Sequence, residues 1–146
     1  MKISTKGRYG LSVMLYLAEN YPTIVSSIFI SKQLDISKLY LDQIFSLLKV
    51  SNLVRVDKGP NGGYTISKPS NQITVYDILK CTQPHLLSKT DSTVGPKSIT
   101  HIDITIQENI FNNLDSLIFN FLNGITLDEL VKLKTEKNDM NDMFYI

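Results

Sequence analysis

Apolar residues recur at helical spacing over most of this chain and alternate only in one short stretch. Near the start, Leu11, Met14, Leu15 and Ala18 follow an i, i+3, i+4, i+7 pattern. This pattern predicts an amphipathic helix that begins after a capping serine or threonine and ends before Pro22. A short helix is predicted to follow over residues 26–34.

A further helix is predicted after Ser37, which is placed to cap it. Four of its residues share one face and must point into the core: Leu41, Ile44, Phe45 and Leu48. The opposite face presents Gln43 and Ser46, flanked by Tyr40, Asp42 and Lys49. Two short helices joined by a tight turn, the second with a polar outer face, form a helix-turn-helix pattern.

The polar face of the second helix suits DNA. Glutamine pairs with adenine in the major groove, and serine and tyrosine bond base edges or phosphates. Short helix pairs also occur in proteins that bind no DNA, so this motif alone does not decide the function.

The alternating stretch lies around the glycine-rich segment "DKGPNGGYTIS" (residues 57–67) and predicts two strands joined by a turn. A nucleotide-binding P-loop requires GxxxxGK[ST] followed by a helix, whereas here Gly63 is followed by Tyr64 and a strand. A β-hairpin directly after a helix-turn-helix gives the order of a winged helix. Arg55 and Lys58 add charge, and a tip that carries Lys58 and Asn61 can enter a minor groove.

The start of the first helix combines Lys6, Arg8 and Tyr9 with two glycines, Gly7 and Gly10. Free N–H groups, basic side chains and small residues that allow close approach suit a phosphate. The alternative is a frayed helix start with ordinary surface bases.

A long apolar stripe marks the second half. Its members, which we expect to form a dimer interface, are Ile110, Phe111, Leu114, Leu117, Ile118 and Phe121. A core helix of a larger monomer is the alternative, but a winged helix offers little surface to cover roughly six turns of helix. After Gly124, the T-x-x-E pattern at Thr126 predicts a short last helix through about Leu133.

The predicted fold class is mostly α with a small β-hairpin, a winged helix-turn-helix domain plus a long dimerisation helix. The expected divisions are a DNA-binding domain (1–80), a loop or sensor segment (81–101), the dimerisation helix with a short C-terminal helix (102–134) and a polar tail (135–146).

Charge differs between the two halves. Residues 1–70 hold nine basic and four acidic residues (net +5), whereas residues 71–146 hold six and ten (net −4). Such asymmetry favours a polyanion as partner of the first half, although chance clustering gives the same numbers. The N-terminus lacks the apolar region of a signal peptide, and no apolar run approaches 18 residues, so we expect a cytoplasmic protein that does not interact with membranes.

Four stretches together resemble the Rrf2 family of bacterial winged-helix regulators: "STKGRYGL" (4–11), "YLDQIFSLLK" (40–49), "GPNGGY" (59–64) and "FLNGITLDELV" (121–131). The resemblance implies a homodimer that binds double-stranded DNA at a palindromic operator. Its helix-turn-helix would occupy major grooves, its wings would lie in minor grooves, and its long helix would cross its twin.

The resemblance also distributes the contacts among residues. Lys6, Arg8 and Tyr9 would contact phosphates. Tyr40, Asp42 and Gln43 would contact the major groove. The minor groove would be contacted by Lys58, Asn61, Gly62 and Gly63. Four further members of the expected DNA-binding set are Ser37, Ser46, Lys49 and Arg55. Relatives commonly carry arginine where this chain has Lys58, and lysine cannot reproduce the fit of a guanidinium in a narrow groove, so we expect weaker readout by the wing.

Several family members bind an iron–sulfur cluster through three cysteines in the segment that corresponds to residues 83–101, which contains none here. Because thiolates are the main cluster ligands, we expect no cluster, no other metal and no cofactor. The single cysteine, Cys81, is either a redox-sensing thiol or, as we favour, a small buried residue. The residues are also compatible with a small-molecule or protein co-regulator that binds near residues 82–101.

These observations predict a sequence-specific transcriptional regulator, a homodimeric repressor that responds to a redox, small-molecule or protein-partner signal. The alternative is a winged helix that serves as a protein-interaction module. The sequence contains no nucleophile–base constellation and no HExxH or GxSxG motif, so an enzyme is not expected.

Overall fold

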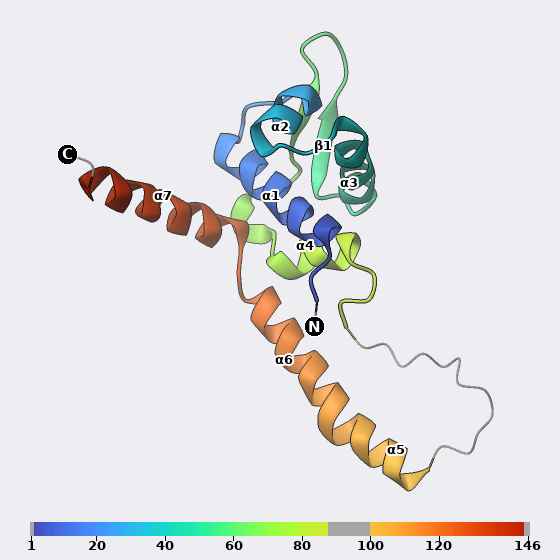
Figure 1. Ribbon diagram of the computed structural model, residues 1–146. Coiled ribbons are helices and arrows are strands. Elements are labelled where there is room, and N and C mark those ends of the chain that lie inside the picture. Colours follow the sequence, from blue (N-terminus) through green and yellow to red (C-terminus); the bar gives the residue numbers. More distant parts are fainter. Residues whose placement is uncertain (1, 88–99, 145–146) are drawn as a thin grey trace.

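The computed structural model describes residues 2–87 and 100–144. Residues 2–87 form the body, which contains α1 (Thr5–Asn20), α2 (Ser27–Leu34), α3 (Lys38–Val50), β1 (Val54–Asp57), β2 (Gly63–Ile66), the 3-10 turn η1 (Ser70–Gln72) and α4 (Val75–Thr82) (Figure 1). The second half consists of α5 (His101–Ile106), the π-helical turn η2 (Gln107–Phe111), α6 (Asn112–Asn123) and α7 (Leu127–Phe144). The prediction of a mostly helical fold with one β-hairpin is confirmed.

Serine side chains set the starts of the first three helices. The Oγ atoms of Ser4, Ser26 and Ser37 each accept a hydrogen bond from the backbone N–H three residues later, at 3.0, 3.2 and 3.2 Å. Such caps satisfy N–H groups that the helix itself leaves unpaired. Asp35 then ends α2 in the left-handed conformation, with φ of 52°, and makes the tight turn into α3.

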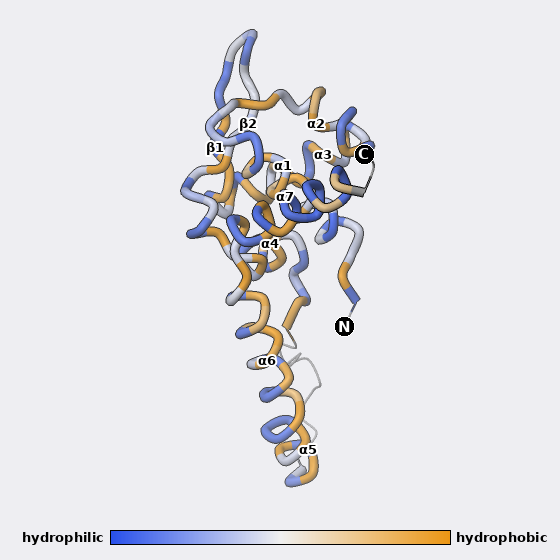
Figure 2. The backbone as a smooth tube through the Cα atoms, turned by 90° about the vertical axis from the view of Figure 1, so that its left-hand side faces the viewer, coloured by the Kyte–Doolittle hydropathy of each residue, from blue (hydrophilic) through white to orange (hydrophobic). Residues whose placement is uncertain are grey.

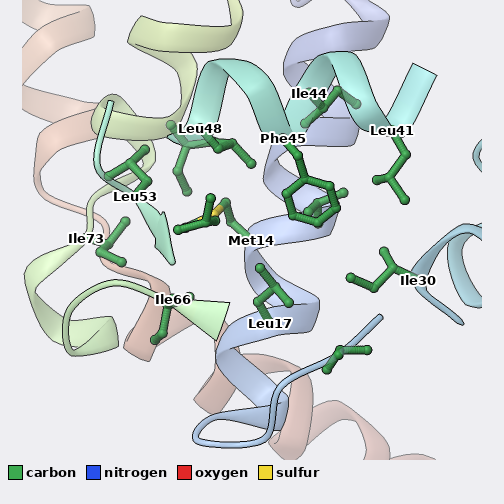
Figure 3. Close-up of a cluster of buried hydrophobic side chains, with 14 of the residues drawn as sticks. Met14, Leu17, Ile30, Leu41, Ile44, Phe45, Leu48, Leu53, Ile66 and Ile73 are labelled. Atoms are coloured by element: carbon green, nitrogen blue, oxygen red, sulfur yellow. The ribbon is translucent and has the colours of Figure 1, made fainter. Parts of the chain in front are cut away.

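The core of the body lies between α1, α2, α3 and the hairpin (Figure 3). The four apolar residues of α3 point into it as predicted and are at most 1% exposed. On α1 the buried face is turned from the predicted one: Val13, Met14 and Leu17 are fully buried, while Leu11 and Leu15 are only half-buried. The apolar pattern missed this rotation because two glycines, described below, belong to the buried face.

The hairpin pairs β1 with β2 in antiparallel register, with Val54 opposite Ile66 and Asp57 opposite Gly63. It projects from the body beyond α2 and α3 (Figure 1). Val25 pairs with Tyr64 through two backbone hydrogen bonds of 3.0 and 2.9 Å, which attach the hairpin to the segment before α2.

The arm, residues 101–123 (α5, η2 and α6), points away from the body (Figures 1 and 2). The C-terminal end of α6 packs on α4. Leu122 is buried with Val75 and Leu79, and the rings of Tyr76 and Phe119 meet edge-to-face with centroids 4.7 Å apart. One face of the long helix thus packs against its own chain.

Two of the predicted divisions need correction. α7 runs to Phe144, so the expected polar tail is helical over all the residues described there. The tail lacks glycine and proline, and Lys134 Nζ lies 2.7 Å from a carboxylate oxygen of Glu19, which holds α7 against α1. α4 ends at Thr82, so residues 81 and 82 of the predicted loop or sensor segment belong to a helix. Most of the predicted sensor segment, residues 88–99, falls outside the described residues.

Candidate nucleic-acid interface

The outward face of α3 carries the side chains expected to read bases. Gln43, Ser46 and Lys49 are exposed, and Tyr40 and Asp42 lie half-buried beside them. Because the opposite face of the helix is locked into the core, this polar strip cannot turn inward. α3 therefore presents the kind of surface that a recognition helix needs.

Lys38, which was not among the predicted residues, lies at the start of this strip. Its Nζ donates to both carboxylate oxygens of Asp42, at 3.1 and 3.0 Å, and both side chains are about half exposed. The i, i+4 spacing of opposite charges was the available signal. The pair neutralises the carboxylate that would otherwise repel phosphates, so Asp42 and Lys38 have to be considered together. Ser46 donates its hydroxyl to the Asp42 carbonyl at 2.9 Å.

The start of α1 lies beside the start of α3. The Tyr9 and Tyr40 rings meet edge-to-face, with centroids 5.6 Å apart. Arg8 is exposed and Lys6 half-buried on this first turn. The contact places the basic end of α1 next to the polar strip of α3.

The two glycines of α1 have a different role from the predicted close approach to phosphate. A Cβ atom at Gly7 would lie 2.9 Å from Gln83 Oε1, and one at Gly10 would lie 2.8 Å from Thr82 Cγ2. Both glycines are buried against the end of α4. They allow two helices to pack closely, and that part of the prediction is wrong.

The wing is fixed to α3 by aromatic stacking. The Phe45 and Tyr64 rings are nearly parallel, 8° apart, with centroids separated by 3.6 Å. Phe45 belongs to the buried face of α3 and Tyr64 to β2, so the contact sets the position of the hairpin relative to the recognition helix. Gly63 is required where the hairpin passes Val25, because a Cβ there would lie 2.3 Å from the Val25 carbonyl oxygen.

The wing tip is a tight turn closed by the Gly62 N–H, which donates to the Gly59 carbonyl at 3.0 Å. Gly59 has φ of +124°, which side chains other than glycine rarely adopt. A Cβ at Gly62 would lie 2.3 Å from the Asp57 carbonyl oxygen, so Gly62 serves the turn itself. Lys58 and Asn61 are exposed at the tip, and Arg55 is exposed on β1.

The arm exposes most of the apolar residues assigned to a dimer interface. Leu117 and Phe121 are 67% and 68% exposed, and Ile110, Phe111 and Leu114 between 42% and 56%. Ile118 differs, because it is partly buried against the cluster of the body and α6 that contains Leu122. Soluble proteins rarely leave such a contiguous apolar surface uncovered.

A family model described as an iron-dependent transcriptional regulator, Rrf2, matches residues 3–133. The chain belongs to the Rrf2 family. It is 35% identical to the HTH-type transcriptional regulator IscR of Pectobacterium atrosepticum over 143 residues, which cover 94% of this chain and 84% of that protein.

Solved structures of Rrf2 relatives have the same fold. CymR, the global cysteine regulator of B. subtilis, superposes with a TM-score of 0.74 at 27% identity, covering 91% of this chain and 98% of CymR. T. potens IscR gives 0.74 at 26% identity, with coverage of 94% and 90%. This Rrf2 protein is a DNA-binding transcriptional regulator with a winged helix-turn-helix, and its relatives are regulators rather than enzymes.

The described residues of this Rrf2 protein do not fit a thiolate-bound cluster. Its one cysteine donates its thiol to the Ile78 carbonyl at 3.2 Å within α4. Burial raises the pKa of Cys81, which lowers the fraction of reactive thiolate. Across residues 2–87 and 100–144, no group of three or more His, Cys, Asp or Glu side chains is arranged to hold a metal ion. Within the same ranges, no helix is both long and apolar enough to span a membrane.

Proposed function

We propose that this Rrf2 protein is a homodimeric repressor that binds a palindromic operator. Each protomer places the polar strip of α3 in a major groove and its wing tip in the neighbouring minor groove. The start of α1 contacts phosphates between them. A dimer bound across a promoter excludes RNA polymerase from the same DNA, which is why repression is the proposed outcome.

The observation that carries the proposal is the pair of aromatic contacts on either side of α3. The Tyr9–Tyr40 contact joins it to α1, and the Phe45–Tyr64 stack joins it to the wing. The three segments expected to touch DNA are thereby held in one frame before DNA arrives. Preorganised contacts lose less conformational entropy on binding than contacts on independent loops.

Within this frame, the residues take distinct roles. Gln43 and Ser46 read base edges, with Tyr40 and Asp42 at the side of the strip. Lys49, Lys6 and Arg8 contribute phosphate contacts, which supply affinity but little sequence information. Lys58 and Asn61 enter the minor groove, while Gly62 shapes the tip and Gly63 lets the hairpin pass close to Val25.

The exposed apolar surface of the arm supports the dimer. Side chains such as Leu117 and Phe121 gain most from burial against a second copy, and the arm projects far enough from the body to make that contact. A two-fold interface is self-complementary, so the same stripe can cover itself.

Genome-wide mapping of occupied sites provides the operator, and fluorescence anisotropy then compares it with a scrambled duplex over a range of salt concentrations. We expect tight binding to the operator only, with log affinity falling linearly against log salt. Gln43→Ala should lose preference for the operator, by about 1–3 kcal/mol at the contacted base. Lys49→Ala is the matched control on the same helix and should weaken both duplexes alike. Equal binding of the two duplexes by the unmodified protein would refute the proposal.

Repression and cluster independence have separate tests. Transcription in vitro from the mapped promoter should fall as the protein is added, and an increase would show an activator instead. The visible spectrum of protein purified without air should lack the absorption of an iron–sulfur cluster. A coloured cluster of defined stoichiometry would contradict the ligand argument.

A further inference from the structure

Gln83, the residue that follows α4, places a buried amide between two parts of the chain that are far apart in sequence. Its side chain is part of the body interior, with the residue 8% exposed. Its Oε1 accepts a hydrogen bond of 2.8 Å from the Ser4 N–H, and its Nε2 donates one of 3.0 Å to the Lys2 carbonyl. Both partners are backbone groups, so they fix which way the amide points.

The amide holds the segment that leads into α1. Ser4 is the N-cap of that helix, and its Oγ accepts from the Gly7 N–H. Gly7 lets the amide lie close to the α1 backbone, since a side chain at this position would collide with Gln83 Oε1. Ile3 packs nearby with Leu86 in the cluster that also contains Leu79. The backbone of residues 2–4 is therefore held from two sides by residues 83–86.

The helix that carries Gln83 at its C-terminal end, α4, is fixed at its N-terminal end. The Val75 N–H donates to the Ile125 carbonyl at 2.9 Å, and the Leu127 N–H donates to the Ile73 carbonyl at 2.9 Å. Thr74 and Asp77 close a capping box at the same end. Because α4 is bonded to the corner between α6 and α7, Gln83 has a defined position relative to the rest of the chain.

We propose that Gln83 is a positioning residue for DNA binding: its amide fixes the entry to α1 and thereby sets Lys6 and Arg8 against the DNA backbone. The inference rests on the proposed contact between the start of α1 and phosphates. Gln83 itself does not touch DNA. Gln83 affects DNA affinity indirectly, because Lys6 and Arg8 reach phosphates only if the first turn of α1 is held in one position next to α3.

The test uses Gln83→Met, which keeps the length of the side chain and removes both hydrogen bonds. We expect roughly a tenfold loss of affinity for operator and scrambled DNA alike, because phosphate contacts carry no sequence information. The slope of log affinity against log salt should become shallower by up to about 2 for each protomer, since Lys6 and Arg8 would each lose a phosphate and about 0.9 counterion is released per contact. Ile78→Val, which alters the buried face of the same helix, is the control and should leave the slope unchanged.

A double-mutant cycle with Arg8→Ala separates positioning from general destabilisation. If Gln83 acts through the start of α1, removing Arg8 as well should add little to the loss caused by Gln83→Met. Purely additive losses, or a salt slope identical to that of the unmodified protein, would overturn the inference. Gln83→Asn keeps the amide but shortens the side chain by one methylene, so the amide no longer reaches both the Ser4 N–H and the Lys2 carbonyl. It should show the same change of slope, and it serves as the test if Gln83→Met does not fold.

The outcome also distinguishes this inference from the proposed function. If the unmodified protein shows no preference for its mapped operator, the proposed function fails whatever Gln83 does. If operator binding is specific and Gln83→Met retains full affinity and slope, only the positioning role is wrong.

Discussion

The body and the arm contain similar apolar residues, but the body buries them and the arm exposes them. In the body, Leu41, Ile44 and Phe45 are at most 1% exposed, whereas on the arm Leu117 and Phe121 are about two-thirds exposed. Hydropathy along the chain barely distinguishes the two regions, since apolar residues continue along the arm (Figure 2). The core of the body closes within one chain, whereas in the proposed dimer the apolar surface of the arm is closed only by a second copy.

This difference explains how one short chain can satisfy two requirements. The body must hold its three DNA-facing segments rigidly, which a closed core achieves. In the proposed dimer the arm sets the distance between two bodies, through a surface that the second copy covers. Under this proposal, operator spacing is a property of the arm and base preference is a property of α3.

The largest effect should come from truncating the core. Phe45→Ala removes a ring that fills the core and stacks on Tyr64, and should cost about 3–5 kcal/mol of unfolding free energy. Phe121→Ala is the matched truncation on the arm. Urea unfolding at several protein concentrations measures both. The cost of Phe121→Ala should depend on concentration because it acts on association. A large, concentration-independent cost at Phe121 would show that the arm packs on its own body.

Charging the arm should abolish its association. Leu117→Asp places a carboxylate on a surface that must become apolar and dry, so we expect dimer dissociation to rise at least 100-fold, about 2.7 kcal/mol. Analytical ultracentrifugation measures it. Circular dichroism should show an intact body, and operator affinity should fall to that of a single half-site. A stable dimer in this variant would place the interface elsewhere. Asn112→Asp is the charge-matched control, because Asn112 is exposed and lies about 140° around α6 from Leu117.

A smaller effect concerns the close packing of α1 on α4. Helix propensity alone predicts that Gly10→Ala is stabilising by about 1 kcal/mol. The collision with Thr82 Cγ2 should reverse the sign and cost about 1–2 kcal/mol. Thr82→Ser removes the colliding methyl and keeps a hydroxyl that can donate to the Ile78 carbonyl. The double variant Gly10→Ala/Thr82→Ser should recover the propensity gain in thermal unfolding, and no recovery would contradict the packing explanation.

The smallest effect involves Cys81, which reports on the body alone. Burial raises its pKa in the folded state above the ordinary value of 9.0, so the folded state keeps its proton longer than the unfolded state does. The stability linked to this proton is present below pH 9.0 and is lost as the pH rises through the raised pKa. Cys81→Ala should therefore flatten the decline of thermal stability at alkaline pH. Alkylation of the thiol should accelerate in Phe45→Ala and stay slow in Leu117→Asp, and the reverse pattern would contradict the comparison.

The sequence pattern was sufficient for the elements that follow simple rules. The cap at Ser37, the buried face of α3 and the hairpin were all predicted from spacing and turn chemistry. The buried face of α1 was misplaced because Gly7 and Gly10 have no side chain to mark it. α7 was predicted too short because its outer half is polar, and only the contact between Lys134 and Glu19 shows that it continues against α1.

For the DNA-facing surface, the sequence supplied candidates but not their relations. Gln43 and Ser46 could be placed on the outer face by counting residues along a helix. The contact between Tyr9 and Tyr40 could not, because it joins residues of separate helices. The role of Gln83 was equally hidden, since its partners are backbone atoms some eighty positions away.

The π-helical turn at Gln107–Phe111 has a consequence for the phase of the arm. A π turn takes up about one more residue than an α turn, so it sets the following residues back by about 100° around the axis. In an uninterrupted α-helix, the apolar residues from Ile102 to Phe121 would drift around nearly half of the circumference. With the turn in place, Ile102 and Ile106 come into line with Leu114 and Phe121. Deleting one residue from this turn would split a straight seam into two seams that face different directions.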